Sequence, residues 1–283
     1  MAIETALAFG TAIISADSRQ FYQEMNIGTA KPTSMELEQV PHYFVNNRSI
    51  SDPMNVQDFY NEASVVLHKL LHAKGIAVVV GGSGQFVDAL LQGMDPVPVY
   101  PELRKSLEAD LAQFGLDSLV EQLAQRDPTI LEHIDLKNSR RVLRALEVSL
   151  GSGKSWLSFQ EKKTNTSFEV LRFVISWPRE VLYSRINQRV DQMILEGLEA
   201  EVFGLNHLAH LAPMNTVGYK EWIDFFKGKT NREFVINTIK QHTRNYAKRQ
   251  LTWLNRYDQL TQLDPLQPVG LFEQLKDSIE KYH

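Results

Sequence analysis

The residues best suited to chemistry lie in the stretch IISADSRQFYQEMNIGTAKP, residues 13–32. An apolar run ends at Asp17, and the polar side chains of Ser18, Arg19 and Gln20 follow it directly. A carboxylate at the carboxyl end of a buried strand can accept a proton from a bound nucleophile. It can equally cap a turn or a helix. Position alone leaves both interpretations of Asp17 open, and the polar side chains that follow it favour a ligand site.

A second polar loop follows another apolar run in the sequence VVVGGSGQF, residues 78–86. Its glycines would allow the backbone N–H groups and the Ser83 hydroxyl to approach a ligand closely. The loop is not a dinucleotide-binding fingerprint, because that pattern needs a glycine where Val87 stands. Many turns between a strand and a helix need glycine, so this loop alone is weak support for a site.

The sequence GSGKS, residues 151–155, is similar to part of a phosphate-binding P-loop. The full pattern needs a further glycine where Val148 stands, with a strand before the loop and a helix after it. Residues 140–150 have a helical pattern instead. We therefore expect a surface turn after a helix.

Two segments place basic side chains at helical spacing. In RRVLRALEV these are Arg140, Arg141 and Arg144, and in KQHTRNYAKRQLTW they are Lys240, Arg244, Lys248 and the adjacent Arg249. A solvated helix face is the usual explanation of such runs. The second segment has no acidic partners at matching spacing, which favours contact with an anion such as phosphate.

The elements that would position these residues alternate between strands and helices. Short runs of apolar and β-branched residues predict buried parallel strands at 13–15, 76–80 and 173–177, with a weaker candidate at 257–263. Helical periodicity covers 59–74, 102–150, 181–205 and 233–256. This alternation predicts an α/β fold with helical insertions.

The composition excludes several classes of function. The 283 residues include no cysteine, which excludes disulfides, thiolate catalysis and cysteine-based zinc sites and suits a reducing cytoplasm. The sequence contains no apolar run of about 18 residues, the length that would predict a membrane span. The net charge is −4, so contact with a nucleic acid would depend on local basic patches.

Taken together, the motifs resemble the tRNA dimethylallyltransferases, also called tRNA isopentenyltransferases. The matching segments occur in the family's order and extend over nearly the whole chain. They are IISADSRQFYQEMNIGTAKP, VPH at 40–42, VVVGGSGQF, RRVLRALEV, GSGKSWLS, MILEGLEAEV at 193–202, TVGYKE at 216–221 and AKRQLTW at 247–253.

The resemblance implies that a dimethylallyl group moves from dimethylallyl diphosphate to N6 of an adenine beside the tRNA anticodon, adenosine 37 in the family. It implies Asp17 as the catalytic base and a catalytic role for the hydroxyl of Ser83. The tRNA contacts would come from Asp17, Ser18, Arg19 and Gln20 and from Arg140, Arg141, Val142, Leu143 and Arg144. Arg244, Lys248 and Arg249 would contact the diphosphate or other phosphates. The resemblance also implies that Mg²⁺ binds the diphosphate, with no metal site formed by protein residues alone. It further implies a monomer that is located in the cytoplasm.

The family fold is a P-loop-kinase-like α/β core with helical insertions. We expect residues 1–100, 166–190 and 240–283 to form the core, 101–165 a helical insertion, and 191–239 a lid-like helical insertion. The family also has an N-terminal strand followed by G-x-T-x-x-G-K-T, and residues 1–283 contain neither.

Loss of this strand would leave its neighbours unpaired, so we expect prenyl transfer by this chain to be impaired. A start placed too late and a shortened relative that no longer catalyses both stay open as explanations. The alternative functions are a non-catalytic tRNA-binding protein and, less favoured, a small-molecule kinase.

Overall fold

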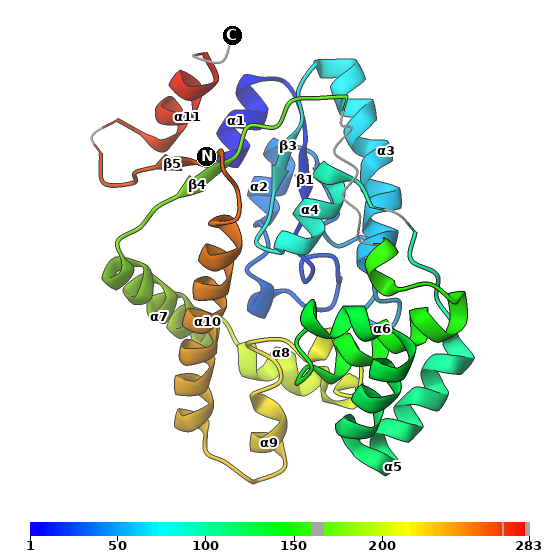
Figure 1. Ribbon diagram of the computed structural model, residues 1–283. Helices are drawn as coiled ribbons and strands as arrows, with labels where there is room; N and C mark the ends of the chain where they lie inside the picture. The colour runs from blue at the N-terminus through cyan, green and yellow to red at the C-terminus, as the bar shows by residue number, and fades with distance from the viewer. Residues whose placement is uncertain (95, 160–166, 268, 281–283) are drawn as a thin grey trace. The chain divides into compact units, whose positions relative to one another are not determined.

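The computed structural model describes residues 1–94, 96–159, 167–267 and 269–280. The chain divides into two compact units, Met1–Leu91 with Phe168–His283, and Gln92–Ser167. The strands are β1 (Ile13–Ser15), β2 (His42–Tyr43), β3 (Val78–Val80), β4 (Phe173–Ile175) and β5 (Thr261–Leu263). The first helices are α1 (Ala2–Ala8), α2 (Ser34–Gln39), α3 (Val56–Lys74), α4 (Gly84–Gln92), α5 (Pro101–Arg126) and α6 (Ser139–Ser152). They are followed by α7 (Arg179–Leu195), α8 (Leu198–Gly204), α9 (Trp222–Phe226), α10 (Arg232–Leu254) and α11 (Leu271–Glu280) (Figure 1).

A parallel sheet of order β2-β1-β3 lies at the centre of the larger unit. Ile13 pairs with His42 on one side and with Val78 on the other. Its side chain packs in a cluster with α1, whereas the side chain of Ile14, which points to the opposite face of the sheet, packs with residues of α3. Because both faces are covered, the strand consists of consecutive apolar residues rather than alternating ones. The strands predicted at 13–15 and 76–80 are thereby confirmed.

The remaining strands form a separate parallel sheet, in which Phe173 of β4 pairs with Thr261 of β5. Leu263 is buried there against Leu275 and Ile279 of α11. Among the described residues, no strand pairs with the outer edge of β3 or with the outer edge of β4. Val80, at the end of β3, is 41% exposed, although the neighbouring strand β1 is fully buried.

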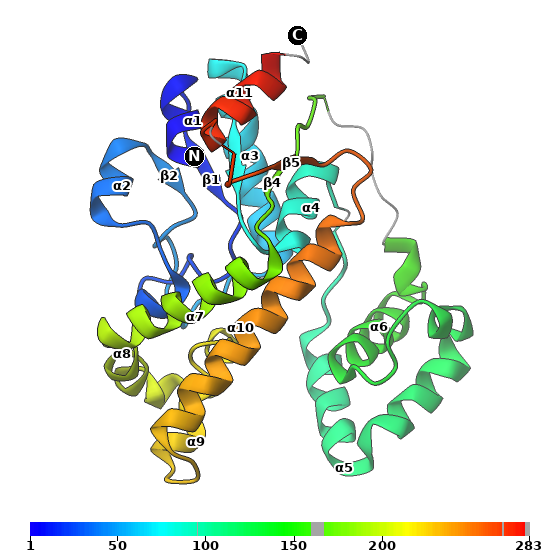
Figure 2. The same ribbon diagram turned by 90° about the vertical axis from the view of Figure 1, so that its left-hand side faces the viewer.

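Helices α7 to α10 belong to the larger unit, and α7 lies beside α10 (Figure 2). The helix predicted over 181–205 is divided in two at Gly197, whose φ of 101° is in the left-handed region and ends the helical path. Apolar residues of the 191–239 segment, among them Leu198, Tyr219 and Trp222, enter the same core as β1 and α3.

The smaller unit is helical and has its own core. The long helix α5 is kinked at Gly115, which has a φ of 81°, and α5 then packs against α6. Glu147 is buried inside this unit, where it forms ion pairs with Arg104 and Arg144 and accepts a hydrogen bond from the backbone N–H of Tyr100.

The predicted fold class, an α/β P-loop-kinase-like fold with parallel strands and helical insertions, is confirmed. The division into a core, an insertion and a lid-like insertion stays a prediction. Residues 160–165 of the predicted helical insertion lie outside the described residues. In the described ranges, the structure contains no helix long and apolar enough to cross a bilayer.

Candidate active site

Asp17 lies directly after β1, at the carboxyl end of the central strand of the parallel sheet. The backbone N–H of Ala16 donates to the carbonyl of Val80 at 2.7 Å, which keeps the ends of β1 and β3 together. The Asp17 carboxylate accepts a hydrogen bond of 2.9 Å from the backbone N–H of Arg19. The Asp17 side chain therefore stabilises the turn that follows β1, as Asp side chains often do. Asp17 also lies at the carboxyl end of a parallel strand, where ligands bind in open α/β sheets.

Burial raises the pKa of the Asp17 carboxyl above its ordinary value. The backbone N–H groups of Arg19 and Gln20 and the charge of Arg19 oppose this rise without cancelling it. A carboxylate with a raised pKa is a stronger proton acceptor than an ordinary aspartate. The structure thus gives Asp17 the property that a general base needs.

Ser83 joins the second polar loop to Asp17's loop. Its side chain is buried, its Oγ accepts a 3.0 Å hydrogen bond from the backbone N–H of Ser18, and it donates to Ser18 Oγ at 3.1 Å. The two loops that were singled out in the sequence therefore meet, which brings together Asp17, Ser18 and Ser83.

Helix α10 packs on the glycine loop next to these residues. The carbonyl of Gly82 accepts hydrogen bonds from the Tyr246 hydroxyl at 3.2 Å and from Gln250 Nε2 at 3.0 Å. A Cβ added to Gly82 would lie 2.0 Å from Gln250 Nε2. A side chain at this position would therefore displace the Gln250 amide, which binds the Gly82 carbonyl.

The hydroxyl of Tyr246 interacts electrostatically with the candidate base, Asp17. Burial, first, and the negative charge of Asp17, second, raise the pKa of the Tyr246 hydroxyl, while a hydrogen bond with Ser83 opposes the rise. Tyr246 and Gln250 were not predicted as site residues. They lie four residues apart on the face of α10 that continues to Trp253, and this spacing is the signal that could have identified them.

A hydrogen-bonded chain fixes the end of α10. Trp253 Nε1 donates to the Tyr257 hydroxyl at 3.2 Å, and this hydroxyl donates to Asp88 Oδ1 of α4 at 2.5 Å. Burial and the bond to Asp88 raise the pKa of Tyr257 to about 12. The tyrosine therefore stays a donor at neutral pH, and α10 is held against the helix that follows the glycine loop.

Gln20 and Arg19 are involved mainly with their own loop. Gln20 Oε1 accepts from Ser15 Oγ at 3.1 Å, and Gln20 Nε2 donates to the carbonyls of Thr29 and Ala30 at 3.4 and 3.2 Å. The Arg19 guanidinium donates to the carbonyl of Ser18 at 3.4 Å. Contact of these side chains with tRNA stays a prediction. The structure gives Gln20 a role in holding the loop.

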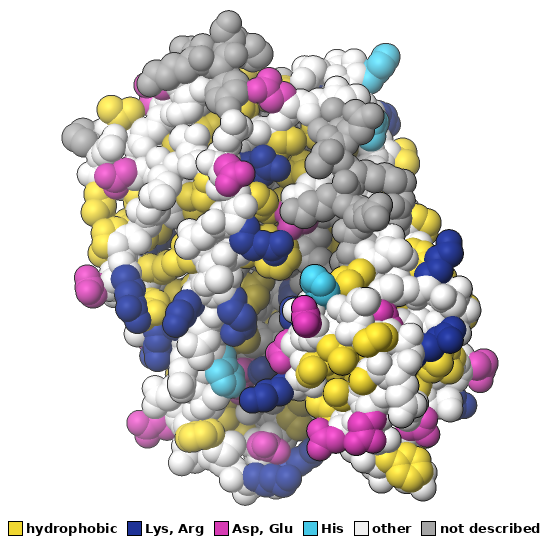
Figure 3. Space-filling view, in the orientation of Figure 1, with side chains coloured by type: hydrophobic (Ala, Val, Ile, Leu, Met, Phe, Trp, Pro, Cys, Tyr) yellow, Lys and Arg dark blue, Asp and Glu magenta, His cyan; other side chains and the backbone are white. Residues whose placement is uncertain are grey.

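The cations predicted on α10 differ in their surroundings. Arg244 donates to Asn187 Oδ1 of α7 at 2.7 Å, whereas Lys240 forms an ion pair with Asp191. Lys248 and Arg249 are exposed, and among the described residues neither has a carboxylate partner within ion-pair distance. Lysine and arginine side chains gather over α7 and α10 in Figure 3. This face is therefore suited to phosphate groups.

The predicted segment 140–144 belongs to the smaller unit, at the start of α6. Arg140 and Arg141 are exposed, and Arg144 is bound to Glu147 and to the carbonyl of Val97. The side chains of Val142 and Leu143 are buried in the core of that unit. Any tRNA contact by side chains of this segment therefore falls to its arginines. GSGKS forms the end of α6 and the turn after it, without a preceding strand, so it is not a P-loop.

Within the described residues, no cluster of three or more His, Cys, Asp or Glu side chains could hold a metal ion. The site itself offers the Asp17 carboxylate with the hydroxyls of Ser18 and Ser83 beside it. Mg²⁺ usually binds one or two carboxylates together with substrate phosphates and water. These residues therefore fit an ion carried mainly by a bound diphosphate.

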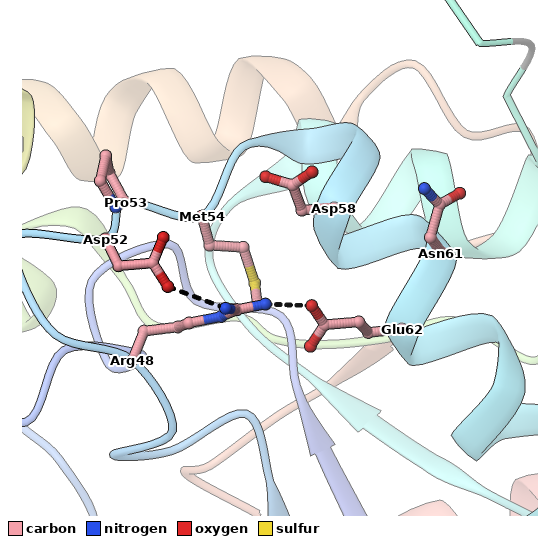
Figure 4. A pocket seen from close by; sticks show the side chains of 7 residues that line it. All are labelled: Arg48, Asp52, Pro53, Met54, Asp58, Asn61 and Glu62. Carbon is pink, nitrogen blue, oxygen red and sulfur yellow. Dashed lines mark hydrogen bonds and ion pairs between the residues drawn. The ribbon is translucent and has the colours of Figure 1, made fainter.

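A cavity of about 310 Å³ lies elsewhere in the larger unit. It is lined by Arg48, Asp52, Pro53, Met54, Asp58, Asn61 and Glu62 (Figure 4). The guanidinium of Arg48 lies between the carboxylates of Asp52 and Glu62 and binds both. Neither Asp17 nor Ser83 lines this cavity, so it is not part of the candidate site.

Comparison with known proteins shows the family to which the chain belongs. Residues 20–257 match the family described as IPP transferase. A tRNA dimethylallyltransferase from Christiangramia forsetii is 43% identical over 258 residues, which cover 90% of this chain and 85% of the relative. A tRNA dimethylallyltransferase 1 from Bacteroides thetaiotaomicron is 38% identical and covers 98% of this chain and 90% of its own length.

Solved structures extend the agreement to the fold. The crystal structure of a tRNA isopentenylpyrophosphate transferase from Bacillus halodurans matches with a TM-score of 0.69 and 32% identity, over 99% of this chain and 89% of that one. A eukaryotic dimethylallyltransferase acting on tRNA has a TM-score of 0.81 at 24% identity, over 99% of this chain and 76% of its own, which shows a shared fold. The family match covers most of the sequence, and the chain is about 40% identical to the Christiangramia forsetii and Bacteroides thetaiotaomicron relatives over 85–90% of their length. The chain therefore belongs to the IPP transferase family.

Proposed function

We propose that the Asp17 site transfers a dimethylallyl group from dimethylallyl diphosphate to N6 of the adenine beside the anticodon of tRNA, adenosine 37 in the family. The observation that carries the proposal is the position of Asp17, a carboxylate with a raised pKa at the carboxyl end of β1 beside the hydroxyls of Ser18 and Ser83. Membership of the IPP transferase family supports the choice of substrates.

The reaction needs a base because the exocyclic amine of adenine is a weak nucleophile. In the proposed step the N6 lone pair forms a bond to C1 of the dimethylallyl group, and the bond from C1 to the diphosphate oxygen breaks. The bonding electrons leave with the diphosphate. One N6 proton moves to the Asp17 carboxylate, which its surroundings make a good acceptor.

The leaving diphosphate needs positive charge near its oxygens. This charge would come from three cations of α10. Lys248 and Arg249 are exposed, and Arg244 is bound to Asn187. Mg²⁺ bound to the diphosphate would supply further charge. The adenine must leave its stack to reach Asp17, which suits the unpaired bases of an anticodon loop.

We further propose that the chain of residues 1–283 transfers the group slowly. In the part of the chain that the structure describes, five strands form two parallel sheets, and the outer edges of β3 and β4 have no strand partner. In the family, the strand that carries the phosphate cradle would pair with such edges. Residues 1–283 contain no G-x-T-x-x-G-K-T sequence to supply the backbone amides that hold a diphosphate.

The test compares dimethylallyl incorporation into unmodified tRNA by purified residues 1–283 and by a form extended at its N-terminus with a strand and the G-x-T-x-x-G-K-T loop of a relative. We expect robust incorporation by the extended form and little by residues 1–283. Equal incorporation by both forms would refute the slow-transfer proposal. Absence of incorporation by a folded, tRNA-binding extended form would refute the assignment of the reaction.

A further inference from the structure

Glu201, in helix α8, binds a loop that is distant in sequence and close to the candidate site. Its Oε2 atom accepts hydrogen bonds from the backbone N–H groups of Asn26 and Ile27 at 3.0 and 2.9 Å. Its Oε1 atom accepts from the backbone N–H of Gly28 at 3.3 Å. Three consecutive amides thus converge on one carboxylate, which is a strong arrangement because charged acceptors form stronger hydrogen bonds than neutral ones.

The hydroxyl of Tyr219 completes this contact by donating to Glu201 Oε1 at 2.6 Å. The Tyr219 side chain is fully buried, and its ring packs so closely on the loop that a Cβ on Gly28 would lie 2.4 Å from the ring. Burial and the charge of Glu201 raise the pKa of Tyr219, so its hydroxyl stays a donor. The loop, α8 and the segment before α9 are therefore held together by Glu201.

The same loop continues to Asp17 through Gln20. The carbonyls of Thr29 and Ala30, next to the amides bound by Glu201, accept hydrogen bonds from Gln20 Nε2. Gln20 directly follows Arg19, whose backbone N–H donates to the Asp17 carboxylate at 2.9 Å. A continuous path of hydrogen bonds and two short stretches of backbone thus connects Glu201 with Asp17.

We propose that Glu201 is a positioning residue for Asp17: it fixes the loop of residues 26–30, and this loop fixes Gln20 and the turn in which Asp17 lies. The helical segment 191–239 thereby takes part in setting the geometry of the base. What the base does rests on the proposed function, but the coupling of Glu201 to Asp17 does not. An ordinary structural contact would stabilise the larger unit without altering Asp17.

The pKa of Asp17 separates these two roles. The N–H groups of Gln20 and Arg19 lower this pKa, against burial, and Arg19 also contributes its charge. The Tyr246 hydroxyl, which donates to the carbonyl of Gly82, interacts electrostatically with Asp17 from α10. If removal of the Glu201 charge loosens the loop, the turn that holds the N–H groups of Arg19 and Gln20 near the Asp17 carboxylate loosens with it, and the pKa of Asp17 rises further. Simple destabilisation lowers the folded fraction and leaves the pKa of the folded molecules unchanged.

The experiment measures the pKa of Asp17 in residues 1–283 by NMR titration of ¹³C-carboxyl-labelled aspartate, with Asp17→Asn to assign the signal. We expect Glu201→Gln to raise this pKa and Glu199→Gln to leave it unchanged. Glu199 is the matched control, because it lies two residues away on α8 and pairs with Arg232 at the surface. An unchanged Asp17 pKa in folded Glu201→Gln protein overturns the proposal, whether or not the protein transfers prenyl groups.

Hydrogen exchange provides a second readout. In Glu201→Gln the amides of residues 26–28 should exchange about tenfold to a hundredfold faster, the ratio expected for loss of a charge-assisted hydrogen bond. Gln20→Met cuts the path beyond this loop. It should raise the Asp17 pKa while leaving these amides protected, and it replaces Glu201→Gln as the test if that variant does not fold. A Gln20→Met protein with an unchanged Asp17 pKa would also contradict the proposal.

Discussion

Substitution of Gly81 by alanine should disturb the candidate site directly, because Gly81 lies against the end of β1. A Cβ at this position would be 2.3 Å from the carbonyl oxygen of Ala16, the residue before Asp17. Contacts below 3.0 Å are essentially never seen, and ordinary contact begins near 3.4 Å. The atoms that this Cβ would meet are backbone atoms of Ala16, so rotation of a side chain cannot relieve the strain.

The required displacement sets the magnitude. The ends of β1 and β3 would have to separate by roughly 0.7 to 1.1 Å, the difference between the 2.3 Å approach and these limits. Overpacking of this kind costs about 1–3 kcal/mol of stability. A misplacement of about 1 Å can reduce the rate of a positioned reaction about 100-fold. We therefore expect a stability loss of about 1–3 kcal/mol and a reduction of the transfer rate of about 100-fold.

Urea denaturation of residues 1–283 measures the stability, and single-turnover dimethylallyl transfer by the extended form measures the rate. Gly204→Ala is the control, because a Cβ at this exposed position meets nothing within 4 Å and its φ is not positive. That substitution should be neutral or stabilising by up to about 1 kcal/mol. A Gly81→Ala protein with unchanged stability and transfer rate would refute the packing argument.

Three further outcomes are expected. Folding raises the pKa of Asp17. At pH values between the ordinary aspartate pKa and the raised pKa, the folded protein therefore binds more protons than the unfolded chain. The free energy of unfolding consequently falls as the pH rises through this window. Asp17→Asn should therefore raise Tm at pH 7 but not at pH 3, and a lower Tm at pH 7 would contradict the assigned burial. Glu147→Gln, at the buried ion-paired position of the smaller unit, should cost about 1–3 kcal/mol in urea denaturation; no loss would show that these ion pairs are not stabilising. Lys248→Ala combined with Arg249→Ala should weaken tRNA binding and reduce the slope of log K against log salt by about 1–2, measured by anisotropy; an unchanged slope would exclude phosphate contact by this pair.

The parts of the fold that could be predicted are those with a local signal. Consecutive buried apolar residues identified the strand at 13–15, and helical periodicity identified α3 and α10. The two-residue strand β2 is too short to show a period, and it exists because His42 and Tyr43 pair with β1. The break at Gly197 was missed because the apolar pattern continues across it.

In the candidate site, too, the residues with a local sequence signal could be predicted and the others could not. Asp17 and Ser83 were identified because each follows a strand, and adjacent parallel strands bring such residues together. Gln250 and Glu201 were not identified, because they act through tertiary contacts with backbone groups 168 and 175 residues away. No local pattern encodes such a contact, although the helical spacing of Tyr246 and Gln250 offered a partial signal.

The central claim, that Asp17 is the base of the transfer, is tested most directly by Asp17→Asn in the extended form. The substitution keeps the size of the side chain and its acceptor for the Arg19 N–H, and it removes the ability to take a proton. The single-turnover rate of dimethylallyl transfer should fall by about 100- to 10,000-fold, the usual contribution of a general base, while tRNA affinity stays within a few-fold. Transfer at the wild-type rate by the Asn variant would contradict the account.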